Sequence, residues 1–332
     1  MESIAVIVET ILEVKALLGK LKPQDRKKKM HYTPKNYLSA WRKDGGVIFM
    51  EKRKINKERR NPESVGREIG FYALPSDFSI DDILFVLNHF VANMRDDARD
   101  EFACDFINYI MNLVIAKFYA TSAPVVDLLE KELNNYIENA YSKAESRIIP
   151  KFKDIDCKQC LLLANKKERN DLIYFMLLQY FRTRMMRERV KLSFIQSGVA
   201  DPLKTYESQI IRSWSILAIL LAMDSWFNLM ADDGNIQITL VEADESCPFV
   251  TGDQPVISLG YDYSGFKENN EMQLYFPLTP TRAVILTHKC LPMFKGKLTC
   301  CNIIFLNDAI VNASYEQVYA MDDKSLKRYV ND

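Results

Sequence analysis

Two short motifs, far apart in the chain, carry the residues best suited to chemistry. His31-Tyr32-Thr33-Pro34 places an imidazole beside a proline that fixes the backbone, and Thr251-Gly252-Asp253-Gln254-Pro255 does the same for a carboxylate. An imidazole exchanges protons near neutral pH, so His31 is the candidate general acid or base. Asp253 either caps its own turn, or it orients His31 or binds a divalent metal such as Mg²⁺.

A second pair of polar residues lies on a predicted helix in the middle of the chain. Gln179 and Arg182 are three residues apart, so they share one face of an otherwise apolar stretch. A buried arginine needs an anionic partner, and either Asp253 or a bound phosphate would serve. We therefore predict that these two residues converge with His31 and Asp253, with the Arg182 guanidinium beside the Asp253 carboxylate. The alternative is that the same residues form a buried structural network.

Basic residues flank the first motif. The run Lys20 to Lys29 ends just before His31, and Lys52 to Lys57 follows a predicted strand. Such runs are either solvated linkers or a surface that attracts a polyanion. The whole chain has 44 basic and 44 acidic residues, so its net charge is zero, which argues against a nucleic-acid footprint over the entire surface.

The glycine and cysteine patterns exclude several classes of protein. Only 11 glycines are present and no phosphate-binding glycine loop occurs, which disfavours dinucleotide-binding and P-loop enzymes. Cys157 and Cys160 form a C-x-x-C, and Cys300 and Cys301 are adjacent, but neither has the second pair of a zinc ribbon. The seven cysteines are predicted to be reduced core thiols, with a redox or metal pair at Cys157 and Cys160 as the alternative.

The N-terminal segment lacks the basic region of a signal peptide, and the most apolar stretch, Ser213 to Met223, is too short to cross a bilayer. We therefore expect a cytoplasmic protein without membrane contact. Residues 2–21 are predicted to form a helix, in which an apolar seam repeats every three to four residues. This helix either docks on its own domain or joins two copies of the chain in a homodimer.

Helical spacing of apolar residues runs from about Ile80 to Met230, and a single long helix is predicted over Lys166 to Ile195. Residues 37–56 are predicted to form a β-hairpin around Asp44-Gly45-Gly46. Alternating and β-branched residues mark further strand candidates, namely Ile236 to Val241, Phe249-Val250, Val256 to Leu259, Met272 to Phe276, Arg282 to Thr287 and Asn302 to Leu306. The last segment, 308–329, is predicted to contain one or two short helices.

This order of elements predicts an α+β fold. We expect a central helical bundle, about residues 80–232, packed against a mixed or antiparallel sheet. The sheet would join the N-terminal hairpin, 37–56, to the strands of 236–306, because an isolated hairpin is only marginally stable. Residues 1–29 would be an N-terminal helix and basic linker, and residues 30–332 a single domain.

Five blocks of the chain resemble a bacterial family known as domain-of-unknown-function family 4238. The blocks are His31-Tyr32-Thr33-Pro34 with Tyr37-Leu38, Gln179 to Thr183, Phe249 to Val256, Phe276 to Pro280, and Asn312 with Tyr319. The third block has Gly252 where the family usually has serine. The resemblance covers about residues 30–320 and names no reaction, but it implies that these blocks build a common site.

Two functions are compatible with the residues and the resemblance. The first is a nuclease-like phosphodiesterase, of the kind used in phage defence or as a toxin, with His31 as acid or base and with Arg182 and Asp253 contacting phosphate or metal. Gln179, Tyr32, Lys52 and Asn312 would contribute to binding of the nucleic acid. The second is a non-catalytic module that binds a small anionic ligand or a partner protein.

Overall fold

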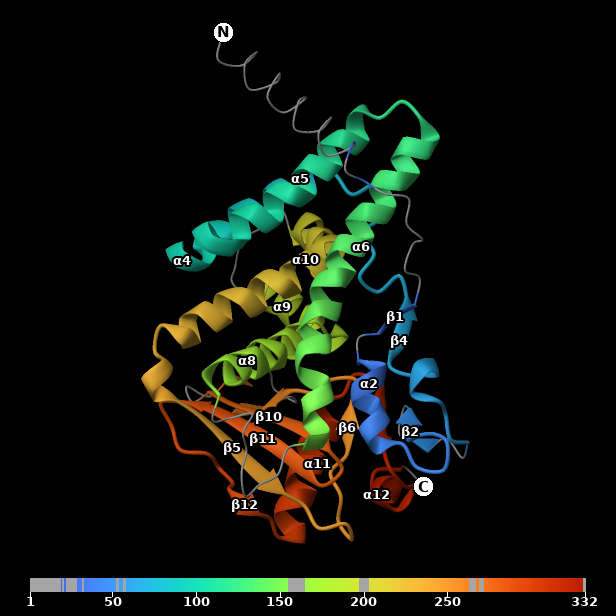
Figure 1. The fold of residues 1–332 in the computed structure, drawn as a ribbon, viewed down its shortest axis with the longest axis vertical. Coiled ribbons are helices and arrows are strands. Elements are labelled where there is room, and N and C mark those ends of the chain that lie inside the picture. The colour runs from blue at the N-terminus through green and yellow to red at the C-terminus, as the bar shows by residue number, and fades with distance from the viewer. Residues whose placement is uncertain are drawn as a thin grey trace.

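The computed structural model describes residues 19, 21, 29–31, 33–51, 54–55, 58–154, 165–196, 203–262, 267–268 and 272–330. Within these ranges helices form the centre of the chain and strands lie before and after them, which confirms the predicted α+β class. The molecule is elongated, with the helical hairpin of α5 (Cys104–Tyr119) and α6 (Ala123–Ile148) towards one end and the β-rich part at the other (Figure 1).

The helical part begins where local sequence favours it. Ser79 and Asp82 form a capping box, Asn165 accepts backbone N–H groups from Lys167 and Glu168, and a proline occupies the first turn after Ser122. The main helices are α3 (Ile80–His89), α5 (Cys104–Tyr119), α6 (Ala123–Ile148), α8 (Lys166–Phe181), α9 (Arg184–Gln196) and α10 (Leu203–Met230). Helix α8 packs against both α6 and α10.

Helix α10, with 28 residues, is the longest helix that the structure describes. Its stretch Tyr206–Met230 is long and apolar enough to cross a membrane by length and composition alone. Of the tested window, 56% is buried inside the protein, and core helices of soluble proteins pass the same test. The expectation of no membrane contact therefore stays a prediction.

A five-stranded sheet lies beneath the helices, with the order β12-β5-β11-β10-β7. Its strands are β5 (Ile236–Glu242), β7 (Ile257–Ser258), β10 (Met272–Thr279), β11 (Arg282–His288) and β12 (Gly296–Lys297). All pairs are antiparallel except β12 with β5. Both faces of β10 and β11 are buried, and alternate residues enter different cores. Leu274 and Phe276 face the helical core, whereas Tyr275 and Ile285 join a second core with α11 (Cys300–Ala313).

A four-stranded sheet, ordered β3-β2-β13-β6, joins the two ends of the described chain. It contains β2 (Ile48–Glu51), β3 (Lys54–Ile55), β6 (Thr251–Gly252) and β13 (Gln317–Ala320). The hairpin segment and one strand of the 236–306 region therefore share a sheet, as expected, but they meet only through β13. The other strands of 236–306 lie in the five-stranded sheet or pair locally, so the single predicted sheet is wrong.

Short elements complete the described chain. They are β1 (Lys29–His31), α2 (Lys35–Leu38), η1 (Ser39–Trp41), η2 (Pro62–Ser64), β4 (Arg67–Ile69), η3 (Val91–Asn93), α4 (Asp96–Ala98), η4 (Arg99–Ala103), η5 (Ile149–Asp154), η6 (Asp233–Asn235), β8 (Tyr261–Asp262), β9 (Lys267–Glu268) and α12 (Lys324–Lys327).

The structure corrects five local predictions. Residues 35–41 are helical rather than the first strand of a hairpin, because Tyr37, Leu38 and Trp41 bury one helical face behind Pro34. Residues 302–306 lie within α11, which a Thr299–Asn302 capping box initiates. Residues 317–320 form β13 instead of a helix, and β6 begins at Thr251, two residues after the predicted strand.

The fifth correction concerns the long helix predicted over Lys166 to Ile195, which is two helices. Helix α8 ends at Phe181 and α9 begins at Arg184. The hydroxyl of Thr183 bonds the Gln254 side chain and accepts the Met186 N–H at 3.4 Å. A hydroxyl used in this way begins a new helix instead of continuing the old one.

Several predicted features lie outside the described residues. These are Tyr32, Lys52, the Cys157 and Cys160 pair, most of the basic runs, and the N-terminal seam apart from Leu21. Of that seam, Leu21 is described and packs against the helical core. The homodimer through the N-terminal helix stays a prediction.

Candidate functional site

Arg182, at the end of α8, is a fully buried cation with a complete set of partners. Only 1% of its surface is exposed. Its guanidinium donates to the Glu145 carboxylate at 2.7 Å, to the Tyr72 hydroxyl at 2.6 Å and to the His31 carbonyl oxygen. The guanidinium carbon also lies 5.2 Å from the ring centre of Tyr72 and 4.9 Å from that of Tyr141. The arginine is thus held by one carboxylate and an aromatic cage.

Asp253 is buried, and its carboxylate accepts hydrogen bonds from backbone N–H groups. Its oxygens accept N–H groups from Tyr315 at 2.7 Å, Glu316 at 2.7 Å and Gln317 at 2.9 Å. Burial raises the pKa of Asp253 to about 6, although the three N–H groups act in the opposite direction. Its geometry is that of a carboxylate that fixes the turn between α11 and β13.

The predicted ion pair between Arg182 and Asp253 is therefore wrong. Arg182 turns towards α6 and β1, where Glu145 and His31 satisfy it, and Asp253 turns towards the backbone before β13. The two segments nevertheless meet one residue further along. Thr183 donates its hydroxyl to Gln254, and the Gln254 amide group donates to Tyr180 O at 3.2 Å.

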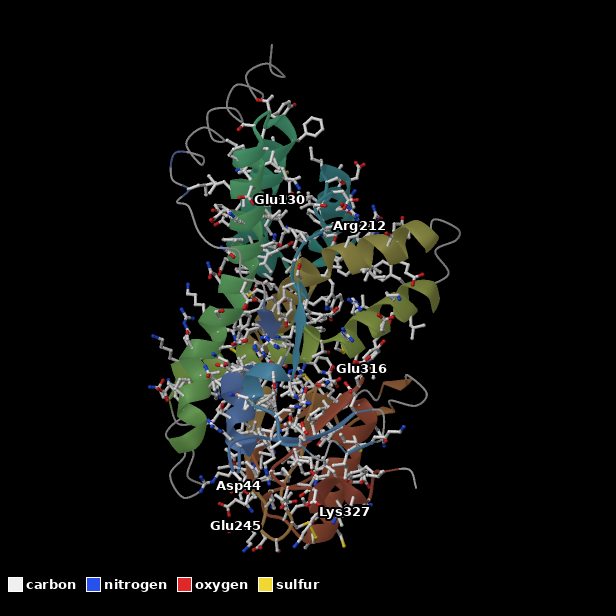
Figure 2. The ribbon with its side chains drawn as sticks, turned by 90° about the vertical axis from the view of Figure 1, so that its right-hand side faces the viewer. Asp44, Glu130, Arg212, Glu245, Glu316 and Lys327 are labelled. Carbon is white, nitrogen blue, oxygen red and sulfur yellow. A yellow bond between two sulfur atoms is a disulfide. The ribbon has the colours of Figure 1, made fainter. Side chains whose placement is uncertain are left out.

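A further ion pair spans the same junction. Arg184 lies 3.4 Å from the Glu316 carboxylate and also pairs with Glu68. Glu316 lies where the helical and β-rich parts of the molecule meet (Figure 2). The helix break at Arg182 and Thr183 is thus tied to the β-rich part on both sides.

Gln179, one helical turn before Arg182, is completely buried. Neither its amide nitrogen nor its amide oxygen has a hydrogen-bond partner among the described residues. A buried amide with no partner carries a desolvation cost. Gln179 is therefore the strongest polar anomaly on α8, and its role in the predicted site stays a prediction.

His31 ends β1 and pairs with Arg67 of β4. Its side chain is half-buried, and its Nδ1 is buried without a hydrogen-bond partner among the described residues. Burial lowers the pKa of His31 to about 4, with further lowering by Arg67, Arg182 and Lys35 and a smaller opposing effect of Glu63. The imidazole is therefore neutral at pH 7 and lies in electropositive surroundings.

The block that contains His31 also contacts the other blocks through Tyr37. Its hydroxyl lies 2.7 Å from the Thr251 hydroxyl and donates to Pro277 O at 2.6 Å. Its ring stacks on Phe276 with centroids 5.2 Å apart. Tyr37 therefore links the first, third and fourth blocks in one buried junction. No pattern in the sequence indicates this role, because the residues around Tyr37 are mostly apolar and predict only a core position.

Gly252 of the third block lies where an added side chain would meet close neighbours. A Cβ atom at this position would collide with the Ser314 hydroxyl and lie 3.2 Å from Gln317 O. Serine here would require the Ser314 hydroxyl to turn away and the tight contact with Gln317 O to relax slightly. Any role for a hydroxyl at this position is therefore absent from this chain.

The remaining predicted binding residue, Asn312, is exposed on α11 and does not join the cluster. The asparagine of α11 that contacts the third block is Asn307, which is 5% exposed. It accepts the Val250 N–H at 3.0 Å and donates to Pro248 O at 3.0 Å. Its place within a run of apolar residues, Ile303 to Ile310, was the available signal in the sequence.

Outside this junction, the described ranges contain a pocket but no cluster of typical metal ligands. No group of three or more His, Cys, Asp or Glu side chains in these ranges is placed to hold a metal ion. A pocket of about 410 Å³ lies between the start of α3 and the end of α5, lined in part by Asp77, Asp81, Lys117 and Phe118. Lys117 is already paired with Glu130 at 2.8 Å, so this pocket is unsuited to an anion.

The fold and the junction define an α+β protein whose distant sequence blocks meet in a buried polar network. Residues 29–324 match the family described as Protein of unknown function (DUF4238), and the chain belongs to this family. No curated protein and no solved structure matches the chain.

Proposed function

We propose that this protein is a non-catalytic binding module for a small anionic group, which contacts His31 and Arg67. The observation that carries the proposal is the unpartnered, buried Nδ1 of His31 in an electropositive setting. A bound anion would accept a hydrogen bond from the imidazole and offset the positive charges around it.

The charges around His31 differ in how far they are already neutralised. Arg182 is paired with Glu145, and Lys35 lies 2.9 Å from Glu63. Arg67, opposite His31 in the β1–β4 pair, forms no ion pair within the described residues. Arg67 is therefore the cation that a ligand would recruit.

Hydrolysis of phosphodiesters, including a role in phage defence, is the second candidate. One observation favours it: a neutral imidazole at pH 7 can accept a proton. The other two expected participants are less suited, because Arg182 is enclosed by protein groups and Asp253 is engaged by three backbone N–H groups. These contacts favour anion binding over hydrolysis as the function of the protein.

Calorimetric titration with sulfate tests the binding proposal, because the charge of this probe does not change over the pH range used. The affinity should rise from about pH 7 to about pH 5, since a bound anion raises the pKa of His31 and binding takes up a proton. Arg67→Gln and His31→Gln should each weaken binding about tenfold or more. The exposed Arg42→Gln is the matched control and should bind normally.

Incubation with DNA and RNA, with and without Mg²⁺, separates the two functions. The binding proposal predicts intact nucleic acid in every lane. Cleavage that is lost in His31→Ala would instead establish the nuclease. Absence of sulfate binding at every pH, or equal binding by the Arg67→Gln variant, would reject the anion site.

A further inference from the structure

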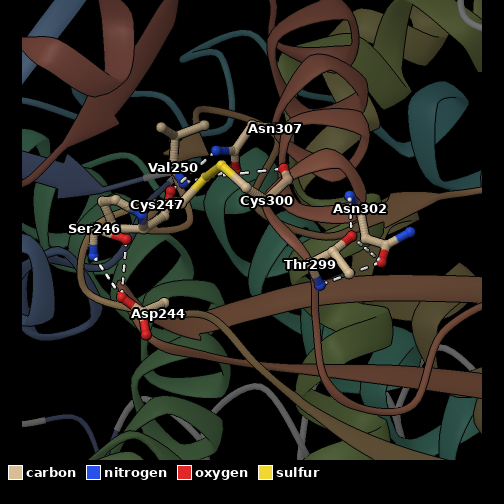
Figure 3. Close-up of a disulfide and its surroundings, with 9 residues drawn as sticks. Asp244, Ser246, Cys247, Val250, Thr299, Cys300, Asn302 and Asn307 are labelled. Atoms are coloured by element: carbon tan, nitrogen blue, oxygen red, sulfur yellow. Dashed lines mark hydrogen bonds between the residues drawn. A yellow bond between two sulfur atoms is a disulfide. The ribbon is translucent and has the colours of Figure 1, made fainter.

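Three cysteines gather where α11 begins. Cys247 lies in the turn after β5 and Cys300 is the first residue of α11; the two form a disulfide with Cα atoms 5.9 Å apart (Figure 3). Cys301 is a free and exposed thiol next to it in the chain. The prediction of reduced core thiols is therefore wrong for Cys247 and Cys300, because the fold brings together two residues 53 positions apart.

This disulfide is accessible from solvent. Cys300 is exposed and Cys247 is half-buried. Glu245, two residues from Cys247, lies at the extremity of the β-rich part, away from Glu130 in the helical hairpin (Figure 2). Small thiols therefore reach the bond without any opening of the core.

The position of Cys300 also favours its thiolate. It occupies the first turn of a 14-residue helix, after the Thr299 cap. The backbone N–H groups of the first turn and the helix dipole stabilise negative charge there, which favours the Cys300 thiolate once the disulfide is reduced. Lys297 adds positive charge nearby, although it is shared with Asp244 at 3.5 Å.

The disulfide and a buried asparagine both tie the same loop to α11. The second tie is Asn307, whose side chain bonds Pro248 O and Val250 N (Figure 3). The following carbonyl, Phe249 O, accepts the Trp41 indole N–H at 2.9 Å. Breaking the disulfide therefore frees residues 244–247 while the non-covalent ties keep 248–253 in place.

We propose that Cys247–Cys300 is a reversible redox latch that exchanges with low-molecular-weight thiols. A thiolate attacks the exposed Cys300 sulfur, forms a mixed disulfide there and releases Cys247 as a thiolate, which takes up a proton. A second thiolate attacks the outer sulfur of the mixed disulfide and releases Cys300. In total, two small thiols become one small disulfide, and the protein disulfide becomes two thiols.

The test is to equilibrate the native full chain with mixtures of reduced and oxidised glutathione, quench with acid, alkylate, and locate the alkyl groups by mass spectrometry. Cys247 and Cys300 should become alkylated together over one transition, and should be protected again on reoxidation. Cys301 should be alkylated in every mixture. Cys247→Ser should leave Cys300 alkylated throughout, while the matched Cys301→Ser should keep the transition.

Hydrogen exchange on the same samples shows what the latch controls. Reduction should speed exchange in residues 244–247, including the Cys247 amide that bonds Asp244 O at 2.9 Å, on the order of tenfold. Exchange in α6 and α8 should not change. A bond that is reduced only in urea, free Cys247 and Cys300 in the most oxidising mixture, or faster exchange throughout the helices would each overturn the proposal.

Discussion

Thr183 donates its hydroxyl to the side-chain oxygen of Gln254, and this bond replaces the ion pair expected between the preceding residues, Arg182 and Asp253. The contact joins the break between two helices to the segment between β6 and β7. Both groups are buried, so each depends on the other for its hydrogen bond. The junction is therefore closed by neutral groups, while the two charges beside it are neutralised elsewhere.

Replacing Thr183 by valine keeps the volume and removes this bond. The buried Gln254 oxygen then loses its donor, which should lower the free energy of unfolding by about 1–3 kcal/mol in urea titrations. Thr239→Val is the matched control, because the Thr239 hydroxyl is buried and has no partner among the described residues. Equal losses in the two variants would contradict the role given to Thr183.

Arg182→Met should be among the most destabilising single substitutions in the chain. It leaves the Glu145 carboxylate and the Tyr72 hydroxyl without their donor, and breaking a buried pair costs about 3–5 kcal/mol. Glu145→Gln should cost less, because Glu145 is 23% exposed and an amide oxygen still accepts. A double-mutant cycle should show strong coupling between Arg182 and Glu145, whereas Asp253→Asn combined with Arg182→Met should be close to additive.

Gln179→Leu should be neutral or should stabilise the protein by about 1–3 kcal/mol, since it removes a buried amide without partners. Thermal and urea unfolding measure the effect. A large loss of stability would instead mean that the amide is satisfied in solution by water or by a ligand.

The pH dependence of stability should reveal two opposed titrations. The pKa of His31 is about 4 in the fold against 6.5 for an ordinary histidine, so its contribution is present above about pH 6.5 and is lost as the pH falls towards 4. The pKa of Asp253 is about 6 against 3.8, so its contribution is present at low pH and is lost as the pH rises through about 6.

In the wild type these effects offset one another, and unfolding free energy should change little between about pH 4 and 6.5. His31→Gln should lose stability as the pH rises through this window, and Asp253→Asn should gain it, each by an amount of order 1–3 kcal/mol. Urea titrations at several pH values measure these slopes. Parallel curves for the three proteins would contradict both assignments.

The disulfide should stabilise the oxidised protein. Its cysteines are 53 residues apart, and closing a loop of that length lowers the entropy of the unfolded chain by the equivalent of about 4 kcal/mol. Cys300→Ala should therefore lower stability in oxidising buffer and change it little in reducing buffer. A similar loss in both buffers would assign the effect to packing of the side chain.

Elements with strong local signals were predictable from the sequence. Helix α3 has its Ser79–Asp82 capping box, α6 has Pro124 in its first turn, and β10 and β11 have long apolar runs. Elements with short or ambiguous apolar patterns were not predictable in this way. Residues 317–320 become a strand because β2 and β6 are available on either side, and no local pattern carries that information.

The candidate site was predictable as a set of segments but not as a set of contacts. The first, second, third and fourth sequence blocks do meet, through Tyr37, Arg182 and Thr183. The partner of Arg182 could not be read from the sequence, because 44 acidic residues were available and Glu145 lies on the α6 helix, 37 positions away. Only the packing of α6 against α8 selects it.

Strand β13 gives the four-stranded sheet an order of assembly. It lies between β2 and β6, so neither of these strands has its main partner until Gln317–Ala320 is present. A ribosome adds roughly 5–20 residues per second, so roughly tens of seconds pass between the synthesis of β2 and that of β13. During synthesis the apolar strand β2 is therefore an unprotected edge, and the nascent chain depends on residues 317–320 to cover that edge against aggregation.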